Sequence, residues 1–432
     1  MNTISSAQFA QIARDHTTPL YVYDEAAILA RCAEVKAMPS AFGLSVGYAM
    51  KANANQALLQ LIHQQGIHID ASSLNEARRA HLAGIPWRDI MLTTQEVQDD
   101  ANLKDLETMM TEGLRFNVCS HRQLARIADF AAAHRIPLAM RVHPGEGSGE
   151  SATRNTGDHD SSFGVHLSDM AAVQRFATER GVVFDTVHVH IGSGGDPEAW
   201  RRNVDRQLGI LEQWFPQATR VNFGGGFKVA RMPDEADADI QALGAYAKAR
   251  VLDFHQRTGR RLHTEVEPGT FYVANAGYLL TRVIDKKQTG PQGHRFVLLD
   301  GGMEVNTRPL LYGARHPFWV ISPDGHLRSS DFAPDDMPAD ARPQVVVGRC
   351  CESGDAQTID ATGRIAPRIM AEPDIDDLVV IGGVGAYAAS MSPFNYNSHL
   401  QAAELLLRTD GRVQCIRQRQ TMAHMLANEL PL

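Results

Sequence analysis

Cysteine is scarce in this sequence, and its spacing excludes two kinds of scaffold. The cysteines are five in number, which is odd, and no two form a CxxC pair (Cys32, Cys119, Cys350, Cys351 and Cys415). A disulfide framework or a structural zinc site needs paired or regularly spaced cysteines. Neither is therefore expected, and we predict a cytoplasmic protein in a reducing compartment.

Long apolar runs and an excess of basic residues are also missing. No apolar run approaches the roughly 20 residues that a membrane-spanning helix needs. The opening stretch, MNTISSAQFAQIARDH, lacks the basic start and apolar centre of a signal peptide. The formal net charge is -8, which argues against general nucleic-acid binding. We therefore expect neither a membrane nor a nucleic acid as a partner.

The sequence does contain a long alternation of strand and helix patterns. Its 432 residues are 44% apolar, enough for two domains with buried cores. Between most strand-like runs lies an amphipathic helix pattern. The eight strand-like runs are residues 44–50, 67–71, 90–93, 115–118, 138–142, 184–191, 220–223 and 262–266.

Eight strand–helix units of this length are what a closed parallel barrel needs. The fold prediction is therefore an α/β protein with a (β/α)8 barrel of the TIM type. An open, doubly wound sheet remains the alternative, because local patterns do not show closure. No GxGxxG follows the first strand, which weakens the dinucleotide-binding form of that alternative.

After about residue 275 the pattern changes to strands separated by turn signals such as SPDG and TDG. We predict three parts: residues 25–275 as the barrel, residues 276–432 as a mostly β domain, and residues 1–24 as an N-terminal segment that joins the β domain. A short helix is expected at residues 399–407.

Reactive side chains gather at the predicted C-terminal ends of the barrel strands, where barrel enzymes place their chemistry. In chain order these residues are Lys51, Asp70 with Ser72, Thr93, Asn117, Arg141 with His143, His190 with Ser193, Gly224 to Gly226, and Glu267. A barrel without a site would not need this set.

Lys51 ends the strand-like run of LSVGYAMKANAN. A lysine amine held there can form a Schiff base with a carbonyl compound if its pKa is lowered. The alternative is a solvated lysine at a strand end, and this stretch alone does not decide between them.

The other strand ends suggest a phosphate and a flat ring. Gly224, Gly225 and Gly226 follow a strand and could direct backbone N–H groups at a phosphate, although a tight turn also needs glycine. His190 could stack on a ring or be a core histidine. Glu267 could hold a pyridine nitrogen protonated or bond a loop. HVH also raises the question of a metal, but no third ligand has suitable spacing, so none is expected. Together these residues describe a pyridoxal phosphate site.

With these residues in place, the chain resembles the diaminopimelate decarboxylase family, which has an alanine racemase-like barrel and is related to ornithine decarboxylase. The resemblance covers almost the whole chain. It rests on the segments YAMKAN, HVHIGSG, NFGGGF, VEPG, RPLLYGARH, CCESGD, VGAYAASMSPFNYNS and IRQRQT.

The resemblance implies a cofactor, pyridoxal 5'-phosphate, carried by Lys51. It implies that His190 stacks on the cofactor ring, that Glu267 pairs with the pyridine nitrogen, and that Ser193, Gly224, Gly225 and Gly226 bind phosphate. It places Asp70 and Arg141 near the ring and Tyr387 at the cofactor or its phosphate.

The resemblance also implies a homodimer with shared active sites. Cys351 matches a cysteine supplied by the partner subunit, which acts as the proton donor after carbon dioxide leaves. Glu352 matches a contact to the substrate amine. Arg308 and Tyr312 match residues that receive the distal end of the substrate. The catalytic residues would then be Lys51, Cys351 and His190.

Three positions depart from the family pattern. Thr270 stands where EPGR has its arginine, Ser162 where the SKFG loop has its lysine, and His399 where NYNSRP has its arginine. Thr270 carries no charge and cannot bind a carboxylate in the bidentate way that arginine does.

The predicted function is a carboxy-lyase, most simply one that converts meso-diaminopimelate to L-lysine and carbon dioxide in lysine biosynthesis. The alternatives are a decarboxylase of another amino acid, such as a citryl-amino acid intermediate of siderophore biosynthesis, a racemase, and a non-catalytic relative. Racemases of this fold use a tyrosine rather than the CCESGD segment.

Overall fold

A computed structural model describes residues 4–147, 156–192 and 196–432 of the chain. The chain divides into two compact units. The barrel unit comprises residues 29–228 and 237–272, and the β unit comprises residues 1–28, 229–236 and 273–432. The unit boundaries at residues 28/29 and 272/273 fall within α2 (Glu25–Lys36) and α10 (Thr270–Val273).

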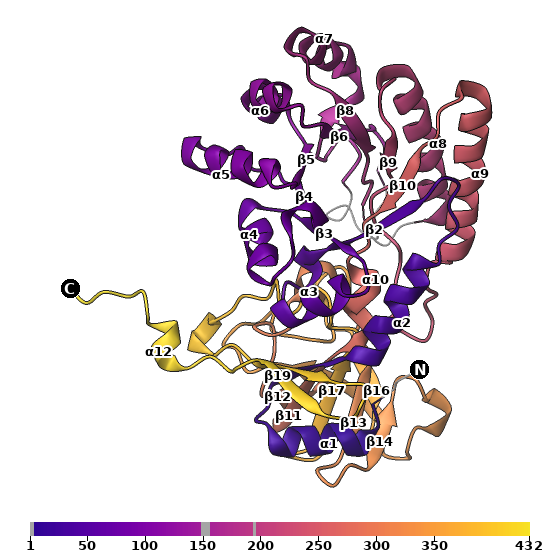
Figure 1. Cartoon of the computed structure of the whole chain (residues 1–432). Helices are drawn as coiled ribbons and strands as arrows, with labels where there is room; N and C mark the ends of the chain where they lie inside the picture. Colours follow the sequence, from indigo (N-terminus) through magenta and orange to yellow (C-terminus); the bar gives the residue numbers. More distant parts are fainter. Residues whose placement is uncertain (1–3, 148–155, 193–195) are drawn as a thin grey trace. The chain divides into compact units, whose positions relative to one another are not determined.

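The described part of the barrel unit contains eight parallel strands that close into a ring (Figure 1). The order is β5-β4-β3-β2-β10-β9-β8-β6, and β5 also pairs with β6. That last pairing excludes the open doubly wound sheet and confirms the predicted barrel. The strands are β2 (Leu44–Ala49), β3 (His68–Ala71), β4 (Ile90–Thr93), β5 (Arg115–Val118), β6 (Leu138–His143), β8 (Phe184–His188), β9 (Arg220–Asn222) and β10 (His263–Val266), with a two-residue strand β7 (Val165–His166) beside β6.

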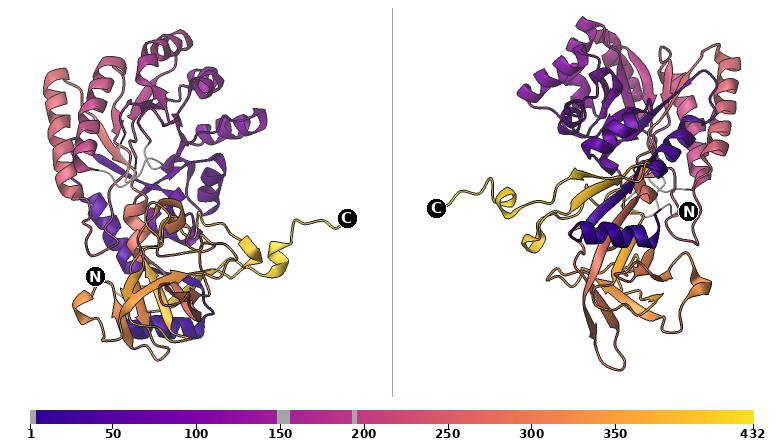
Figure 2. Two further views of the ribbon diagram at one scale, coloured as in Figure 1. Left: turned by 180° about the vertical axis from the view of Figure 1, so that it is seen from behind. Right: turned by 60° about the horizontal axis from the view of Figure 1, so that its bottom comes forward.

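Helices follow the strands and surround the barrel (Figure 1). Polar side chains cap several of them: Ser73, Asp99 and Ser120 each accept a backbone N–H in the first turn of the following helix. The helices are α3 (Gln56–His63), α4 (Leu74–Leu82), α5 (Asp100–Thr111), α6 (His121–His134), α7 (Met170–Arg180), α8 (Pro197–Trp214) and α9 (Ile240–Thr258). Figure 2 shows α8 and α9 side by side. Among the described residues, no helix has both the length and the apolar content needed to cross a bilayer.

The β unit is built on a sheet with the order β14-β13-β17-β11-β1-β18-β19, to which β12, β15 and β16 attach beyond β11. The strand β1 (Leu20–Asp24) pairs with β11 and with β18, so the N-terminal segment is part of this sheet. The remaining strands are β11 (Gly277–Gln288), β12 (Arg295–Leu299), β13 (Phe318–Ile321), β14 (Leu327–Ser330), β15 (Arg342–Val347), β16 (Arg368–Met370), β17 (Leu378–Gly382), β18 (Ala403–Leu407) and β19 (Val413–Arg417).

One face of this sheet is covered by the N-terminal helix α1 (Ser6–Asp15). Ser5 and Gln8 form a capping box at its start. Its apolar side inserts Phe9 against Tyr278, with ring centroids 5.1 Å apart. The two remaining short helices are α11 (Arg308–Tyr312) and α12 (Met422–Met425).

The prediction of a short helix at residues 399–407 is wrong. Residues 403–407 form the strand β18, which pairs in parallel with β1 and antiparallel with β19. The run AELLL has good intrinsic helix formers, but Leu405 and Leu406 are fully buried between neighbouring strands. Tertiary pairing therefore overrides local preference at this position.

Candidate active site

Lys51 lies on a short helical turn, η1 (Met50–Ala52), directly after β2. The flanking residues hold this turn in place. The Tyr48 hydroxyl donates to the Asn53 carbonyl at 2.9 Å, and Asn55 caps α3 by accepting from the Ala57 N–H at 3.0 Å. The lysine side chain is exposed at the C-terminal end of the strand, where its amine can meet a carbonyl compound.

Glu267 follows β10, the strand that pairs with β2. It is 9% exposed, and both carboxylate oxygens have partners. Asn222 donates to Oε1 at 2.5 Å, and Nε2 of His188 lies 3.1 Å from Oε2. Burial raises the pKa of Glu267 to about 7, and the hydrogen bond from Asn222 opposes this rise. At neutral pH the carboxylate is therefore close to half-protonated, which suits it to share a proton with a ring nitrogen.

His188 is the neutral partner of this carboxylate. Burial and the positive charge of Arg141 hold the pKa of His188 well below its usual range. Nδ1 of His188 has no hydrogen-bond partner among the described residues. The neutral ring can carry its single proton on Nε2 and donate a hydrogen bond from there to Glu267. Nδ1, which has no partner among the described residues, is then an acceptor and not a donor.

Asp70, on β3, is a second buried carboxylate at the same end of the barrel. Burial and the charge of Glu267 raise the pKa of Asp70 well above its ordinary value, and Lys51 and a hydrogen bond with Thr93 oppose the rise. Asp70 Oδ1 has no hydrogen-bond partner among the described residues. Asn117 donates to the Thr93 hydroxyl at 3.3 Å. This bond joins the C-terminal ends of β5 and β4, the strands that follow β3 in the barrel.

Arg141 is a nearly buried cation on β6, 6% exposed. Burial lowers the pKa of its guanidinium, while Cys119, Asp70 and Glu267 oppose that change. Its guanidinium carbon lies 4.8 Å from the ring centroid of Phe163. Arg141 thus brings positive charge to the two buried carboxylates.

The glycine loop after β9 can exist only with glycine. Gly224 and Gly226 have φ of +67° and +94°. An added Cβ would lie 2.5 Å from the Glu267 carbonyl oxygen at Gly225 and 2.3 Å from the Gly192 carbonyl oxygen at Gly226. The Gly225 N–H donates to Nδ1 of the half-buried His190 at 3.3 Å. The loop and the predicted ring-stacking histidine therefore lie in contact.

A small cavity opens beside this loop. It is lined by Gly225, Gly226 and Lys228 and by Asp196 and Pro197 at the start of α8, and its volume is about 20 Å³. Ser193, the remaining predicted phosphate contact, lies outside the described residues.

These residues fit pyridoxal phosphate. The glycine loop leaves a cradle that any side chain would fill, and glycine N–H groups are suited to a phosphate. Glu267 offers a buried carboxylate for a pyridine nitrogen, and Lys51 offers an amine two residues past the neighbouring strand. The barrel unit therefore contains residues suited to the phosphate, to the pyridine nitrogen and to the aldehyde of the cofactor.

In the β unit, the structure brings together three of the predicted residues. Arg308 begins α11 and is 2% exposed. Its guanidinium carbon lies 5.7 Å from the ring centroid of Tyr312 and 5.8 Å from that of Tyr387. Tyr387 has a φ of 59°, a left-handed conformation that is uncommon for a tyrosine. An arginine close to two aromatic rings is restrained in its orientation, and its guanidinium is suited to bind an anion.

Cys351 and Glu352 are exposed on a neighbouring turn of the β unit. The Cys351 N–H donates to Asn397 Oδ1 at 2.7 Å, and the Tyr396 hydroxyl donates to Glu352 Oε2 at 3.3 Å. Hydrogen bonds from Gly354, Ser353 and Tyr396 lower the pKa of Glu352. Both residues are thus accessible, and the NYNS segment supports the backbone that presents them.

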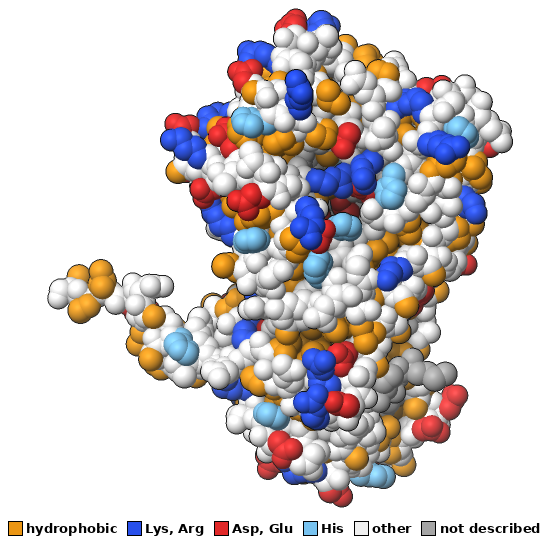
Figure 3. Space-filling model, in the orientation of Figure 1, with side chains coloured by type: hydrophobic (Ala, Val, Ile, Leu, Met, Phe, Trp, Pro, Cys, Tyr) orange, Lys and Arg blue, Asp and Glu red, His pale blue; other side chains and the backbone are white. Residues whose placement is uncertain are grey.

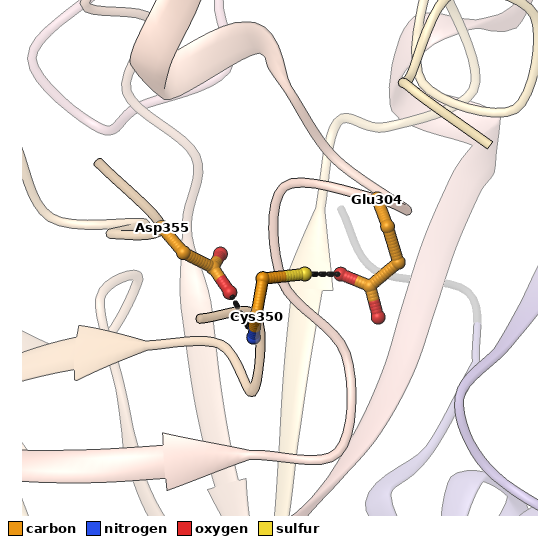
Figure 4. Close-up of side chains that lie close together, drawn as sticks. All are labelled: Glu304, Cys350 and Asp355. Carbon is orange, nitrogen blue, oxygen red and sulfur yellow. Dashed lines mark hydrogen bonds between the residues drawn. The ribbon is translucent and has the colours of Figure 1, made fainter. Parts of the chain in front are cut away.

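The turn before Cys351 is held by Glu304, Cys350 and Asp355 (Figure 4). Asp355 accepts the N–H groups of Met303 at 2.6 Å and Cys350 at 2.8 Å. Glu304 accepts the Gly302 N–H at 2.8 Å, and the Cys350 thiol lies 3.4 Å from its Oε2. Because these donors already use the carboxylate oxygens, we assign the three side chains to support of the turn.

The structure also describes the three residues that depart from the family pattern. Thr270 begins α10, three residues after Glu267. Ser162 precedes Phe163, the ring over which Arg141 lies. His399 directly follows η7 (Tyr396–Ser398), and its carbonyl accepts a hydrogen bond from Asn395 at 3.0 Å.

Sequence reasoning missed Asn222 and treated His188 only as a candidate metal ligand. Asn222 donates to Glu267 and accepts the Gly224 N–H at 2.9 Å, so it connects the carboxylate to the glycine loop. The signal was available in the NFGGGF segment, where a polar side chain stands inside a barrel strand. The contact between His188 and Glu267 joins strands 79 residues apart in sequence.

Residues 26–274 match the family described as "Pyridoxal-dependent decarboxylase, pyridoxal binding domain". The chain is 32% identical to the diaminopimelate decarboxylase of Streptomyces coelicolor over 431 residues, covering 99% of this chain and 92% of that protein. It is 32% identical to the enzyme of the same name from Escherichia coli K12 over 415 residues, covering 95% and 94% of the two chains.

Solved structures give the same result. A crystal structure of diaminopimelate decarboxylase superposes with a TM-score of 0.89 at 30% identity, covering 99% of this chain and 98% of that one. The Helicobacter pylori diaminopimelate decarboxylase in complex with L-lysine superposes with a TM-score of 0.81 at 25% identity, covering 98% and 99%.

Proposed function

The chain belongs to the diaminopimelate decarboxylase family of pyridoxal phosphate-dependent decarboxylases, and on this premise we propose that it converts meso-diaminopimelate to L-lysine and carbon dioxide. Full-length similarity to enzymes of that name supports the substrate. The observation that carries the proposal is the placement of Lys51 and the buried Glu267 at the ends of two paired strands.

Bound pyridoxal phosphate supplies an electron sink for the bond to the leaving carboxylate. In our proposal, Lys51 would hold the cofactor through Nζ, at the place where the substrate amine binds. Glu267 holds a proton at the pyridine nitrogen, and His188 and Asn222 orient its two oxygens. His190 covers the ring face. The N–H groups of Gly224, Gly225 and Gly226, together with Ser193, bind the phosphate.

Asp70 and Arg141 complete the cofactor side. Asp70 has an unsatisfied Oδ1 and a raised pKa, so it can accept or hold a proton near the lysine. Arg141 is buried beside Asp70 and Glu267 and offsets their negative charge.

On the substrate side, we propose that Arg308 and Tyr312 receive the distal end of the substrate and that Glu352 contacts the substrate amine. Tyr387 contacts the cofactor, and Sγ of Cys351 returns a proton to the carbon that lost carbon dioxide. Because Cys351 and Glu352 are exposed, we propose that they act in a homodimer, on the active site of the partner. The free cysteines agree with the cytoplasmic location that we propose.

The direct test is carbon dioxide release by the purified protein with pyridoxal phosphate and meso-diaminopimelate, with L-lysine measured in parallel. Equal amounts of both products would support the proposal. Lys51→Ala should abolish release together with the visible absorbance of the bound cofactor. Lys248→Ala is the matched control, because Lys248 is an exposed lysine on α9 of the same unit. Absence of release from protein with bound cofactor would reject the substrate, and release without L-lysine would reject the product.

A second candidate substrate is favoured by Thr270. This position offers a hydroxyl where the family pattern has an arginine, so a carboxylate there would lose a charged bidentate partner. The candidate is another α-amino acid, such as a citryl-amino acid. Thr270→Arg distinguishes the two: it should raise kcat/KM for meso-diaminopimelate if that is a poor substrate, and should lower it if the site is already adapted to it.

A further inference from the structure

The N-terminal mouth of the barrel, opposite the end that holds Lys51, carries a second group of charged side chains. Arg115 is the first residue of β5 and Arg220 the first residue of β9. Arg88 lies in the turn η2 (Trp87–Asp89) just before β4, and Arg261 lies just before β10. Because parallel strands begin at one edge of the ring, the register brings these residues to one opening.

This opening is hollow. A cavity of about 160 Å³ within the barrel is lined by Arg88, Arg115 and Arg220. A cavity needs only about 10–15 Å³ of this kind of space to hold one water molecule. A second, more open hollow of about 350 Å³ shares Arg220 and is lined by Arg261, His263, Thr219 and Phe42. Figure 3 shows Lys or Arg, His and some Asp or Glu side chains around a hollow on the barrel unit.

One carboxylate at this opening already has its partners. Glu265 accepts from Arg115 at 2.9 Å and from Arg220 at 2.8 Å, both at Oε1. These two arginines lower the pKa of Glu265 despite its burial. Asp89 lies 3.0 Å from His63 and 3.6 Å from His68. The local acids are therefore already engaged with other groups.

Two of the arginines at this mouth have no carboxylate partner among the described residues. Arg88 and Arg261 are exposed, and neither forms an ion pair with a described residue. The guanidinium of Arg261 lies 5.5 Å from the ring centroid of Phe42, which orients it at the rim of the open hollow. The open hollow has no carboxylate among its lining residues, although the whole chain carries a formal charge of -8. A concave basic site on an acidic protein concentrates anions.

The inner cavity also reaches Asp70, Asn222 and Glu267 at its far end. The pKa values of both carboxylates are raised, so they add less negative charge than two ordinary acids would. The outer hollow, bounded by Arg220, Arg261 and His263, is therefore the more favourable place for an anion.

We propose that this mouth is a binding site for a small anion with two or more negative charges on phosphate or carboxylate oxygens. Arg220 and Arg261 bind it directly in the outer hollow. Arg88 adds charge from the inner cavity, which shares Arg220, and Thr219 offers a polar contact. The site is separate from the catalytic end of the barrel and independent of the decarboxylase substrate.

The test is calorimetric titration of the holoenzyme with inorganic phosphate and, separately, with citrate, at constant ionic strength set by sodium chloride. Bound cofactor occupies the phosphate cradle. Anion bound at Arg308 is told apart from anion bound at the mouth because the variants at the mouth leave it unchanged. We expect saturable binding of one anion per chain. The double variant Arg88→Gln/Arg261→Gln should weaken binding at least tenfold, and the matched control Arg175→Gln, an exposed arginine on α7, should not.

Tighter binding of citrate would identify a polycarboxylate site, and tighter binding of phosphate would identify a phosphate site. Absence of saturable binding by either probe would overturn the proposal, as would equal affinity of wild type and the double variant. Decarboxylase turnover is measured in the same preparations. Because the heat of anion binding does not depend on turnover, failure of the proposed function and failure of this site are distinguishable.

Discussion

Glu265 and Glu267 lie two residues apart at the end of the same strand, both are buried, and they have opposite chemistry. Two arginines lower the pKa of Glu265. Glu267 meets an asparagine and a neutral histidine instead, and burial raises its pKa to about 7. The difference teaches that burial alone does not decide the state of a carboxylate. The neighbours across the barrel decide whether it remains a fixed charge or can exchange a proton.

The largest expected effect separates the two glutamates by function. Glu267→Gln should lower kcat about 100-fold or more, because the amide cannot hold a proton at the pyridine nitrogen. Glu265→Gln should leave kcat within a few-fold and lower the free energy of unfolding by roughly 1–3 kcal/mol, because Arg115 and Arg220 lose a shared partner. Equal losses of kcat in both variants would contradict the comparison.

The cradle beside Glu267 gives the second prediction. Gly225→Ala should weaken cofactor binding at least tenfold, because its Cβ would lie 2.5 Å from the Glu267 carbonyl oxygen. Gly209→Ala, on α8 with nothing within 4 Å of its added Cβ, is the control. It should keep full affinity and gain up to about 1 kcal/mol of stability. Cofactor titration followed by absorbance measures both, and a Gly225→Ala protein with native affinity would remove the loop from the site.

The raised pKa of Glu267 predicts a pH dependence of the apoprotein. Below the ordinary pKa of 4.5 the side chain is protonated in both the folded and unfolded states, and ionisation between pH 4.5 and about 7 favours the unfolded chain. This group should therefore remove up to about 3 kcal/mol of stability as the pH rises through that range. Urea unfolding of wild type and Glu267→Gln at pH 5 and 7.5 measures the difference. An equally steep loss in Glu267→Gln would exclude Glu267 as its source.

The smallest expected effect concerns the partner of Glu267. His188→Gln replaces the donor to Oε2 with a more flexible one and should raise the pKa of Glu267 further, because the ionised form loses stabilisation. The pH dependence of the bound cofactor's absorbance should move upward, with kcat reduced about three- to tenfold. His166→Gln, an exposed histidine on β7, serves as the control. An unmoved spectral titration would mean that His188 has only a structural role.

Much of this architecture is local in origin and was predictable. The alternation of buried apolar strands with capped helices indicates a barrel, because strand and helix periodicities are read from neighbouring residues. The same alternation places Lys51, Asp70 and Arg141 at the ends of strands. Residues 403–407 show the limit of such reasoning, since AELLL is helix-forming in isolation and becomes a strand only between β1 and β19.

The sequence by itself determined the barrel, the mostly β second unit, the family and the residue types available for chemistry. Only the tertiary structure decided which carboxylate is a fixed charge and which one titrates near neutrality. That outcome depends on contacts such as Glu265 with Arg115 and Glu267 with His188, which join residues 150 and 79 positions apart. Such partners meet because the strands close into a ring, and electrostatic interactions act through that distance in space rather than along the chain.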